Sequence, residues 1–197
     1  NNPKYKNLVK KILSKKLINA SIFVETDLLA ACRATCGNKS GIVSILGTGS
    51  NSCLFDGKKI MKKIDSLGYL FGDEGSGFEM GKNFLIKYKR DDLPQDLSLI
   101  FKQMYDKNND ILEKIYLETN TSKLVSNFSE FVFENKDHPY IDYYINEHFT
   151  SYFNKILSNY NKRYYLNFCG SIAYYFKSYI KNISKKKEFK IGKIRRK

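Results

Sequence analysis

Two short apolar runs flank a polar stretch of small residues in the first third of the chain. The runs are SGIVSILG at 40–47 and SCLFD at 52–56, and GTGSN at 47–51 joins them. A hairpin needs a short connection whose backbone can adopt unusual dihedral angles, and glycine adopts these at no steric cost. The pattern predicts two antiparallel strands, and GKKIMKKI at 57–64 continues the meander after a glycine turn.

Patterns typical of helices surround this meander. Before it we expect a helix within 4–17, a short buried strand ASIFV at 20–24, and a helix DLLAACRATC closed by Gly37. After it, the segment 78–88 has helical spacing, and Pro94 opens a further helix. That second helix should bury one face, made by Leu97, Ile100, Phe101 and Met104.

The second half of the chain continues the alternation. Apolar residues recur at intervals of three and four from 111 to 133, and DHP at 137–139 introduces a long helix. RYYLNFCGS then indicates a strand that ends at Gly170, and SIAYYFKSYI the helix that follows it. Strands that alternate with helices, together with a meander, predict an α/β protein.

Length and composition limit the class of protein. With 197 residues, 42% of them hydrophobic, the chain can form a buried core in one domain or in parts of two. No apolar run approaches the roughly 20 residues that cross a bilayer, and the first residues do not resemble a secretory signal, so we expect a cytoplasmic protein. The cysteines form no C-x-x-C pair and fall inside apolar patterns, which favours reduced core thiols over disulfides or zinc ligands: Cys32, Cys36, Cys53 and Cys169.

The formal net charge of +14 raises the possibility of a nucleic-acid partner. However, the lysines are scattered along the whole chain, and only the final segment KKKEFKIGKIRRK is dense in basic residues. This distribution favours a solvated basic surface over a nucleic-acid site.

The GTGSN stretch has two interpretations. Glycine lets backbone N–H groups approach a ligand closely, so the hairpin could form a nest for phosphate oxygens, with Thr48 and Ser50 adding hydroxyl donors. Alternatively, the glycines serve only the geometry of the turn. The stretch is not a Walker loop, because no Gly-Lys-Ser/Thr follows and the next element is a strand.

Three carboxylates also allow two interpretations each. Asp27 begins the helix DLLAACRATC, where an acidic residue can act as a cap, or can be kept ionised for use as a general base. Asp73 and Glu74 lie between glycines in GYLFGDEGSG. They can belong to a loop that wraps around a small polar ligand and accept its hydroxyl hydrogen bonds, or to a plain loop before a helix.

Four features in this order carry a family resemblance: an acidic residue opening a helix, ILGTGSNSCLFDG, LGYLFGDEGSGFEMGK, and a late strand that ends in FCGSIAYYF. The set closely resembles the N-acetylglucosamine kinase and BadF/BadG/BcrA/BcrD-type ATPase family, within the superfamily of sugar kinases, heat-shock ATPases and actin. The resemblance extends from about residue 20 to 194. It implies a ribonuclease H-like, actin-type α/β lobe with a mixed sheet flanked by helices, over 39–185. Residues 1–38 would then be a remnant of an N-terminal lobe, and 186–197 a basic tail.

The resemblance also implies roles for single residues. Gly47, Thr48 and Gly49 would contact the nucleotide phosphates, and Ser50 and Asn51 the sugar. Further roles follow at other motifs: Asp27 as catalytic base toward the sugar hydroxyl, Asp73 as the acid that holds sugar hydroxyls, Ser66, Leu67 and Gly68 as a turn lining the sugar, and Gly170, Ser171, Ile172 and Ala173 as the adenosine-binding turn. ATP is the implied cofactor, and Mg²⁺ would arrive with it, without a dedicated protein metal site.

The chain departs from the family at its start. Members open with a hairpin that carries an Asp-x-Gly-x-Thr type first phosphate loop, and no such motif occurs here. We therefore expect an incomplete chain with little or no kinase activity by itself. The predicted strand ASIFV would lose its neighbours, which predicts poor solubility or dependence on a partner.

The leading hypothesis is an ATP-dependent amino-sugar kinase that acts on the 6-hydroxyl of N-acetylglucosamine. One alternative is a BadF-type ATPase that drives a change in a partner protein, although the cysteines here show no cluster spacing. Another is a non-catalytic sugar- or nucleotide-binding module. The expected partners are a small sugar and ATP, with no nucleic acid and no membrane, and a homodimer is possible by analogy with the family.

Overall fold

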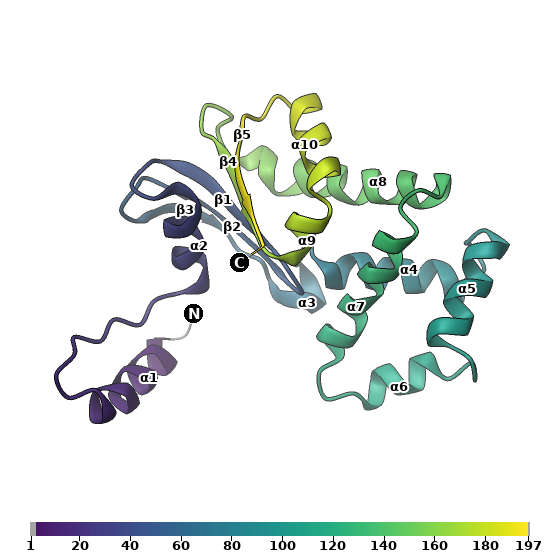
Figure 1. Ribbon diagram of the computed structural model, residues 1–197, viewed down its shortest axis with the longest axis horizontal. Helices are drawn as coiled ribbons and strands as arrows, with labels where there is room; N and C mark the ends of the chain where they lie inside the picture. The colour runs from purple at the N-terminus through teal and green to yellow at the C-terminus, as the bar shows by residue number, and fades with distance from the viewer. Residues whose placement is uncertain (1–2, 197) are drawn as a thin grey trace.

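A computed structural model describes residues 3–196 of the chain, and its centre is a mixed sheet of five strands (Figure 1). The strand order is β3-β2-β1-β4-β5. The first three strands form an antiparallel meander, whereas β4 pairs parallel with β1, and β5 pairs parallel with β4. The strands are β1 Gly41–Leu46, β2 Ser50–Phe55, β3 Ile60–Ile64, β4 Leu166–Cys169 and β5 Ile191–Arg195. The expected α/β class and the meander are confirmed.

Helices precede, interrupt and follow these strands. The two before the sheet are α1 Pro3–Lys16 and α2 Asp27–Cys36. Between β3 and β4 lie α3 Gly68–Phe71, α4 Gly77–Lys89, α5 Gln95–Tyr105, α6 Ile111–Leu117, α7 Thr121–Glu134, α8 Pro139–Lys155 and the short 3₁₀ helix η1 Leu157–Asn159. Between β4 and β5 lie α9 Ser171–Tyr175 and α10 Lys177–Lys186.

One face of the sheet packs against the large group of helices on the right of Figure 1. Because side chains alternate along a strand, Ile42, Leu46 and Phe168 all point to this face. They belong to a single apolar core, rich in aromatic rings, that also includes residues of α4, α5, α7, α8 and α10. Two buried hydroxyl pairs also face this side: Tyr152 with Ser44 at 2.7 Å, and Tyr160 with Ser52 at 2.9 Å.

The opposite face packs against α2. Its cluster is small and contains two cysteines: Leu28, Ala31, Cys32, Val43, Cys53 and Phe55. The Sγ atoms of Cys32 and Cys53 are 3.3 Å apart, and all four cysteines are free thiols. Cys36 and Cys169 pack against the same cluster, so the expectation that the cysteines lie in apolar surroundings is confirmed.

The predicted strand at 20–24 is wrong. Residues 21–26 have no regular secondary structure, because no other strand among the described residues supplies backbone hydrogen bonds to them. Helix α1 agrees with the prediction, but it stands away from the sheet in Figure 1 and leaves apolar side chains such as Leu8 and Ile12 half exposed. An ion pair of 2.8 Å between Lys6 and Glu25 joins it to the segment that follows.

Other elements differ from expectation at their breaks and faces. The pattern over 111–133 forms two helices, α6 and α7, and the helix after Gly170 is divided at Phe176 into α9 and α10. The final basic segment contains β5, which the sequence did not indicate. In α5, Leu97 and Phe101 are buried as expected, whereas two other members of the predicted face are about half exposed: Ile100 and Met104.

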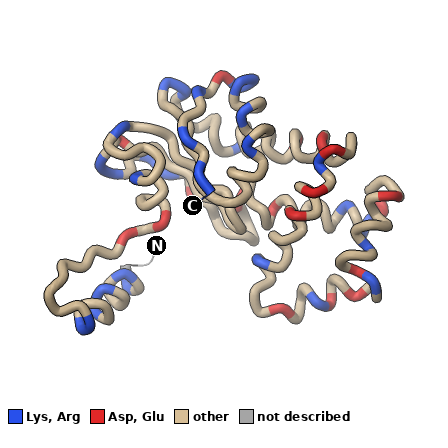
Figure 2. The backbone as a smooth tube through the Cα atoms, viewed as in Figure 1, with Lys and Arg blue, Asp and Glu red and all other residues tan. Residues whose placement is uncertain are grey.

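Basic residues are spread over several elements. Figure 2 shows Lys and Arg on α1, around the sheet and on α10. Acidic residues are interspersed among them in the helical part of the molecule. No helix within residues 3–196 is both long enough and apolar enough to span a bilayer.

Candidate functional site

The 47–51 hairpin lies at the carboxyl end of β1 and is attached to the start of α4. Gly77 and Phe78 donate backbone hydrogen bonds to the carbonyls of Gly47 (2.8 Å) and Thr48 (3.1 Å). The amides of Thr48 and Gly49 donate no hydrogen bond to any described residue. The hairpin therefore offers two free amides and a hydroxyl, which is what a nest for an anion requires.

Asp73 packs directly against this hairpin and is only 8% exposed. Its Oδ1 accepts a hydrogen bond of 3.2 Å from the amide of Ser50. A Cβ atom on Gly49 would lie 2.8 Å from Oδ2, so glycine at this position makes room for the carboxylate. Burial raises the pKa of Asp73; the Ser50 hydrogen bond opposes this effect and the charge of Glu74 adds to it.

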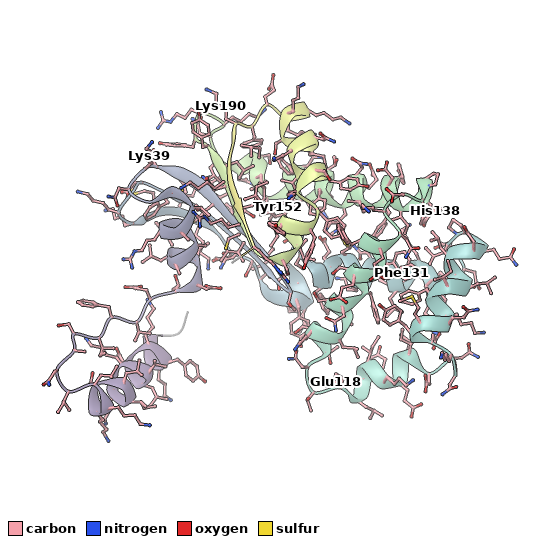
Figure 3. All side chains as sticks on the ribbon, viewed as in Figure 1. Lys39, Glu118, Phe131, His138, Tyr152 and Lys190 are labelled. Carbon is pink, nitrogen blue, oxygen red and sulfur yellow. The ribbon has the colours of Figure 1, made fainter. Side chains whose placement is uncertain are left out.

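The loop that carries Asp73 is held in place by contacts with residues that the sequence pattern did not indicate. Gly75 has a φ of +77°, and a Cβ atom there would lie 2.6 Å from the ring of Tyr152. Figure 3 shows Tyr152 where the sheet meets the helices. The amide of Gly75 donates to Glu79 Oε2 (2.7 Å), and Ser76 caps α4 by accepting from the amide of Glu79 (3.1 Å). The Ser-x-x-Glu spacing is a capping signal that could have been found in the sequence.

The predicted sugar-lining turn lies beside Asp73. The Ser66 carbonyl accepts a hydrogen bond of 2.8 Å from the amide of Asp73. Leu67 and Gly68 both have left-handed φ values, 57° and 72°, which reverse the chain into α3. The side chain of Leu67 is 66% exposed. A small concavity there is lined by residues of the hairpin and of both loops, among them Ser50, Asn51, Ser66 and Glu74.

A cavity of about 340 Å³ also borders the hairpin, at Thr48, and Asp73 does not line it. Thr48, side chains of α7 that include Lys123, Ser126 and Glu130, and the start of α9 at Ser171 and Ile172 line it. Gly170 leads into this turn with a φ of +118°, and a Cβ atom there would lie within 2.2 Å of the Leu46 carbonyl oxygen. Ala173 does not line the cavity, because it is fully buried in the core.

Asp27 is the first residue of α2 and is exposed. Its Oδ1 accepts from the amide of Leu28 (2.8 Å), whereas the cap itself is Thr26, which accepts from the amide of Leu29 (3.1 Å). The other end of α2 is beside the start of β1, since a Cβ atom on Gly41 would lie 2.9 Å from the Sγ of Cys36. Helix α2 thus runs opposite to β1, and its N-terminus points toward the sheet edge that carries the hairpin.

The hairpin and the Asp73 loop combine two kinds of group, and Asp27 stands apart on α2, with no hydrogen bond to either of them among the described residues. Free amides of the hairpin suit an anion, the buried carboxylate of Asp73 suits hydroxyl groups, and the exposed carboxylate of Asp27 can accept a proton. No cluster of three or more His, Cys, Asp or Glu that could hold a metal ion occurs among the described residues.

Solved protein structures resemble this chain. No protein-family model and no curated protein matches the sequence. A protein of Porphyromonas gingivalis, described as a "Putative N-acetylglucosamine Kinase", matches with a TM-score of 0.91 and 32% identity, over 98% of this chain and 69% of that one. A second protein so described, from Chromobacterium violaceum, has a TM-score of 0.64 at 14% identity, over 87% of this chain and 63% of that one, and supports the fold. At the identity and coverage of the first match, the chain belongs to the N-acetylglucosamine kinase family.

Proposed function

We propose that this chain carries the nucleotide- and sugar-binding lobe of an ATP-dependent kinase that phosphorylates the 6-hydroxyl of N-acetylglucosamine. Membership of the family supports a sugar kinase. We further propose that the lobe is of the ribonuclease H-like, actin type, on the basis of the strand order β3-β2-β1-β4-β5 with three antiparallel and two parallel members.

One observation carries this proposal: neighbouring residues of the 47–51 hairpin line a cavity and contact a buried carboxylate. The cavity beside Thr48 and Ile172 has the volume of a small-molecule site, and the buried Asp73 lies against Gly49, the next residue of the hairpin. A nucleotide in the cavity would bring its phosphates to the free amides of Thr48 and Gly49. A sugar held by Asp73 would then stand next to those phosphates.

The sugar side uses acceptors and donors in a small space. Asp73 would accept hydrogen bonds from two sugar hydroxyls, and Ser50, Asn51 and Ser66 would supply further polar contacts. Because the carboxylate of Asp73 is buried, a sugar hydroxyl replaces water there and is held in a defined orientation.

Asp27 would act as general base. Its carboxylate is exposed and lies at the N-terminus of α2. There it would take the proton of the attacking 6-hydroxyl while the hairpin amides hold the phosphoryl oxygens. Mg²⁺ bound to ATP would supply charge neutralisation of the phosphates. In a protein that joins this chain to a first phosphate loop, Asp27→Asn should lower kcat by about 10²–10⁴-fold and leave sugar affinity unchanged.

A binding experiment on the 197-residue chain tests the proposal separately from turnover. We expect the Mg²⁺ complex of a non-hydrolysable ATP analogue to shift the amide NMR signals of Thr48, Gly49 and Ser171. N-acetylglucosamine should shift those of Ser50, Asn51 and the Asp73 loop. Absence of both responses in the folded chain would contradict the proposal.

A matched pair of glycine variants sharpens the test. A Cβ atom on Gly49 would displace the carboxylate of Asp73, whereas one on Gly47 would meet no atom within 4 Å. Calorimetric titration should therefore show N-acetylglucosamine affinity reduced about tenfold or more by Gly49→Ala, through loss of hydrogen bonds to a charged group. Gly47→Ala should retain it. Equal effects of the two variants would remove Asp73 from the sugar site.

A second candidate function is a BadF-type ATPase that acts on a partner protein. The observation in its favour is that all four cysteines gather around the face of the sheet that α2 covers. ATP hydrolysis that proceeds at the same rate with and without N-acetylglucosamine would support this candidate over the kinase.

A further inference from the structure

Two cysteine sulfurs meet where α2 packs on the sheet. Cys32 lies on α2 and Cys53 on β2, and their Sγ atoms are 3.3 Å apart. Both residues are fully buried. Val43, which pairs with Cys53 across the strands β1 and β2, belongs to the same small cluster, so the two sulfurs lie inside the contact between helix and sheet. Neither thiol has a role in the kinase proposed above.

The other two cysteines are placed differently. Cys36 and Cys169 are only partly buried and lie at the margin of the cluster. The Sγ of Cys36 accepts hydrogen bonds from Asn167 Nδ2 (3.4 Å) and Thr35 Oγ1 (3.8 Å). No hydrogen-bond contact joins the sulfur of Cys36 or Cys169 to another sulfur within residues 3–196. Proximity therefore selects one pair of thiols out of the four.

The hydrogen bond between the paired thiols makes them unequal. By donating to the sulfur of Cys32, the Cys53 thiol lowers the pKa of Cys32, and burial opposes this effect. The same hydrogen bond, together with burial, raises the pKa of Cys53. Cys32 is thus the thiol that loses its proton more readily, and the thiolate is the form of cysteine that attacks an oxidant. The thiol of Cys53 already contacts the sulfur on which the product would form.

We propose that Cys32 and Cys53 are an oxidation site, which a peroxide converts into a disulfide that joins α2 to β2. The Cys32 thiolate attacks one peroxide oxygen and the O–O bond breaks, so that Cys32 becomes a sulfenic acid. The hydroxide that leaves takes up the proton lost by Cys32 and becomes water. The Cys53 sulfur then attacks the sulfenic sulfur, and its proton leaves with the hydroxyl as a second water. Two thiols and one hydrogen peroxide thus give one disulfide and two waters.

The fold permits this step with little movement. Bonded sulfur atoms are about 2 Å apart, so closing the gap of 3.3 Å requires roughly 1.3 Å of approach, shared between two side chains. Helix α2 has ten residues, and the cluster between it and the sheet contains six buried residues. Local opening of so small a unit would admit a peroxide to the buried pair.

The disulfide would constrain the part of the chain that carries the candidate site. It closes a loop from residue 32 to residue 53 that contains the 47–51 hairpin, and it ties down the helix that begins at Asp27. A cross-link of this kind chiefly restricts the opened and unfolded states. Oxidation should therefore slow the opening of α2. This inference concerns the thiols alone and does not depend on the proposed kinase.

The test treats the folded 197-residue chain with hydrogen peroxide, blocks the remaining thiols, and locates linked peptides by mass spectrometry without reduction. We expect the loss of two hydrogen atoms and a link between Cys32 and Cys53 that dithiothreitol reverses. Exchange of the Leu29 amide, near the start of α2, should become about tenfold or more slower after oxidation. Thr26→Ala removes the cap of α2 and should speed formation of the link about fivefold, because the helix opens more often.

Matched variants on α2 separate the pair from its neighbours. Cys32→Ala should abolish both the link and the slower exchange, whereas Cys36→Ala, one turn further along the helix, should retain both. Cys53→Ala removes the other partner and should repeat the result of Cys32→Ala. Absence of the link from the unaltered chain, a link through Cys36 or Cys169, or loss of the link in Cys36→Ala would overturn the proposal.

Discussion

The two faces of the sheet are covered to very different depths. On one face, which we call the deep side, α8, α9 and α10 pack on the strands. Their buried residues belong to the same core as those of α4, α5 and α7. On the other face, the shallow side, α2 is the only helix of residues 3–196 that contributes to the cluster of six buried residues. Both faces extend to the end of the sheet where the candidate site lies. Each group of the site is therefore held as firmly as the face of the sheet that supports it.

Asp73 and Asp27 illustrate this difference. Asp73 is held by a loop that rests on Tyr152 and is bonded to Glu79, both of which belong to the deep side. Asp27 is carried by a short helix on the shallow side and is itself exposed. The acid proposed to bind the sugar is therefore held in place by packing and hydrogen bonds, whereas the proposed base lies on a short helix that a small cluster supports.

The largest expected effect compares two phenylalanines of the sheet. Phe168 faces the deep side and Phe55 the shallow side, and they are 0% and 1% exposed. Phe168→Ala should cost about 5 kcal/mol of unfolding free energy, because surrounding rings such as Phe153 cannot collapse into the space. Phe55→Ala should cost about 3 kcal/mol, because α2 can settle toward the strands. Urea unfolding measures both; equal costs would mean that the shallow face is as rigid as the deep one.

A pair of glycines tests the support of the Asp73 loop. Gly75 and Gly68 both have left-handed φ values, but only Gly75 has a close neighbour, the Tyr152 ring. Gly75→Ala should destabilise by about 2–4 kcal/mol, from backbone strain and overlap together. Gly68→Ala should cost about 1–2 kcal/mol, from strain alone. Thermal unfolding and N-acetylglucosamine titration should both separate the variants, and identical behaviour would show that the loop does not rest on Tyr152.

The buried carboxylate of Asp73 makes a prediction about pH. Because its folded pKa is raised, the native state retains a proton that the unfolded chain has already lost, so stability falls as the pH rises between the unfolded and folded pKa values. Asp73→Asn removes this fall and can still accept from the Ser50 amide through its Oδ1. The variant should gain stability relative to the unaltered chain as pH rises through that window, and lose sugar affinity about tenfold. A gain that appears only below the unfolded pKa would contradict the assignment.

Much of the fold could be predicted from local pattern. Local signals predicted the hairpin, the helix from Phe78 and the helix after His138. These signals are glycine, apolar spacing and proline, and each of them acts within a few residues. The strand predicted at 20–24 failed because a strand is defined by its partner, and sequence spacing does not reveal one. For the same reason β5, a basic segment with few apolar residues, becomes a strand only beside β4.

The residues of the candidate site could likewise be predicted only where the sequence signal is local. Gly49 and Asp73 were found because both lie in glycine-rich motifs, but their contact depends on two loops that meet at the end of β1. The sequence pattern did not indicate Tyr152 or His148. Each lies on a helical stripe of the kind that normally forms part of a core. The contacts that they make, with Gly75 and Glu79, join residues more than sixty positions apart in the chain.

The smallest expected effect concerns the shallow face at its most exposed point, the start of α2. Thr26 caps this helix through a hydrogen bond of 3.1 Å to the amide of Leu29. Thr26→Ala should cost about 1 kcal/mol of stability, as the loss of a helix cap commonly does. Hydrogen exchange should show faster opening of the Leu28 and Leu29 amides, while the amides of α4, on the deep side, keep their protection. If α2 and α4 open together, the two faces form one cooperative unit, and the proposed base is as firmly supported as the acid that binds the sugar.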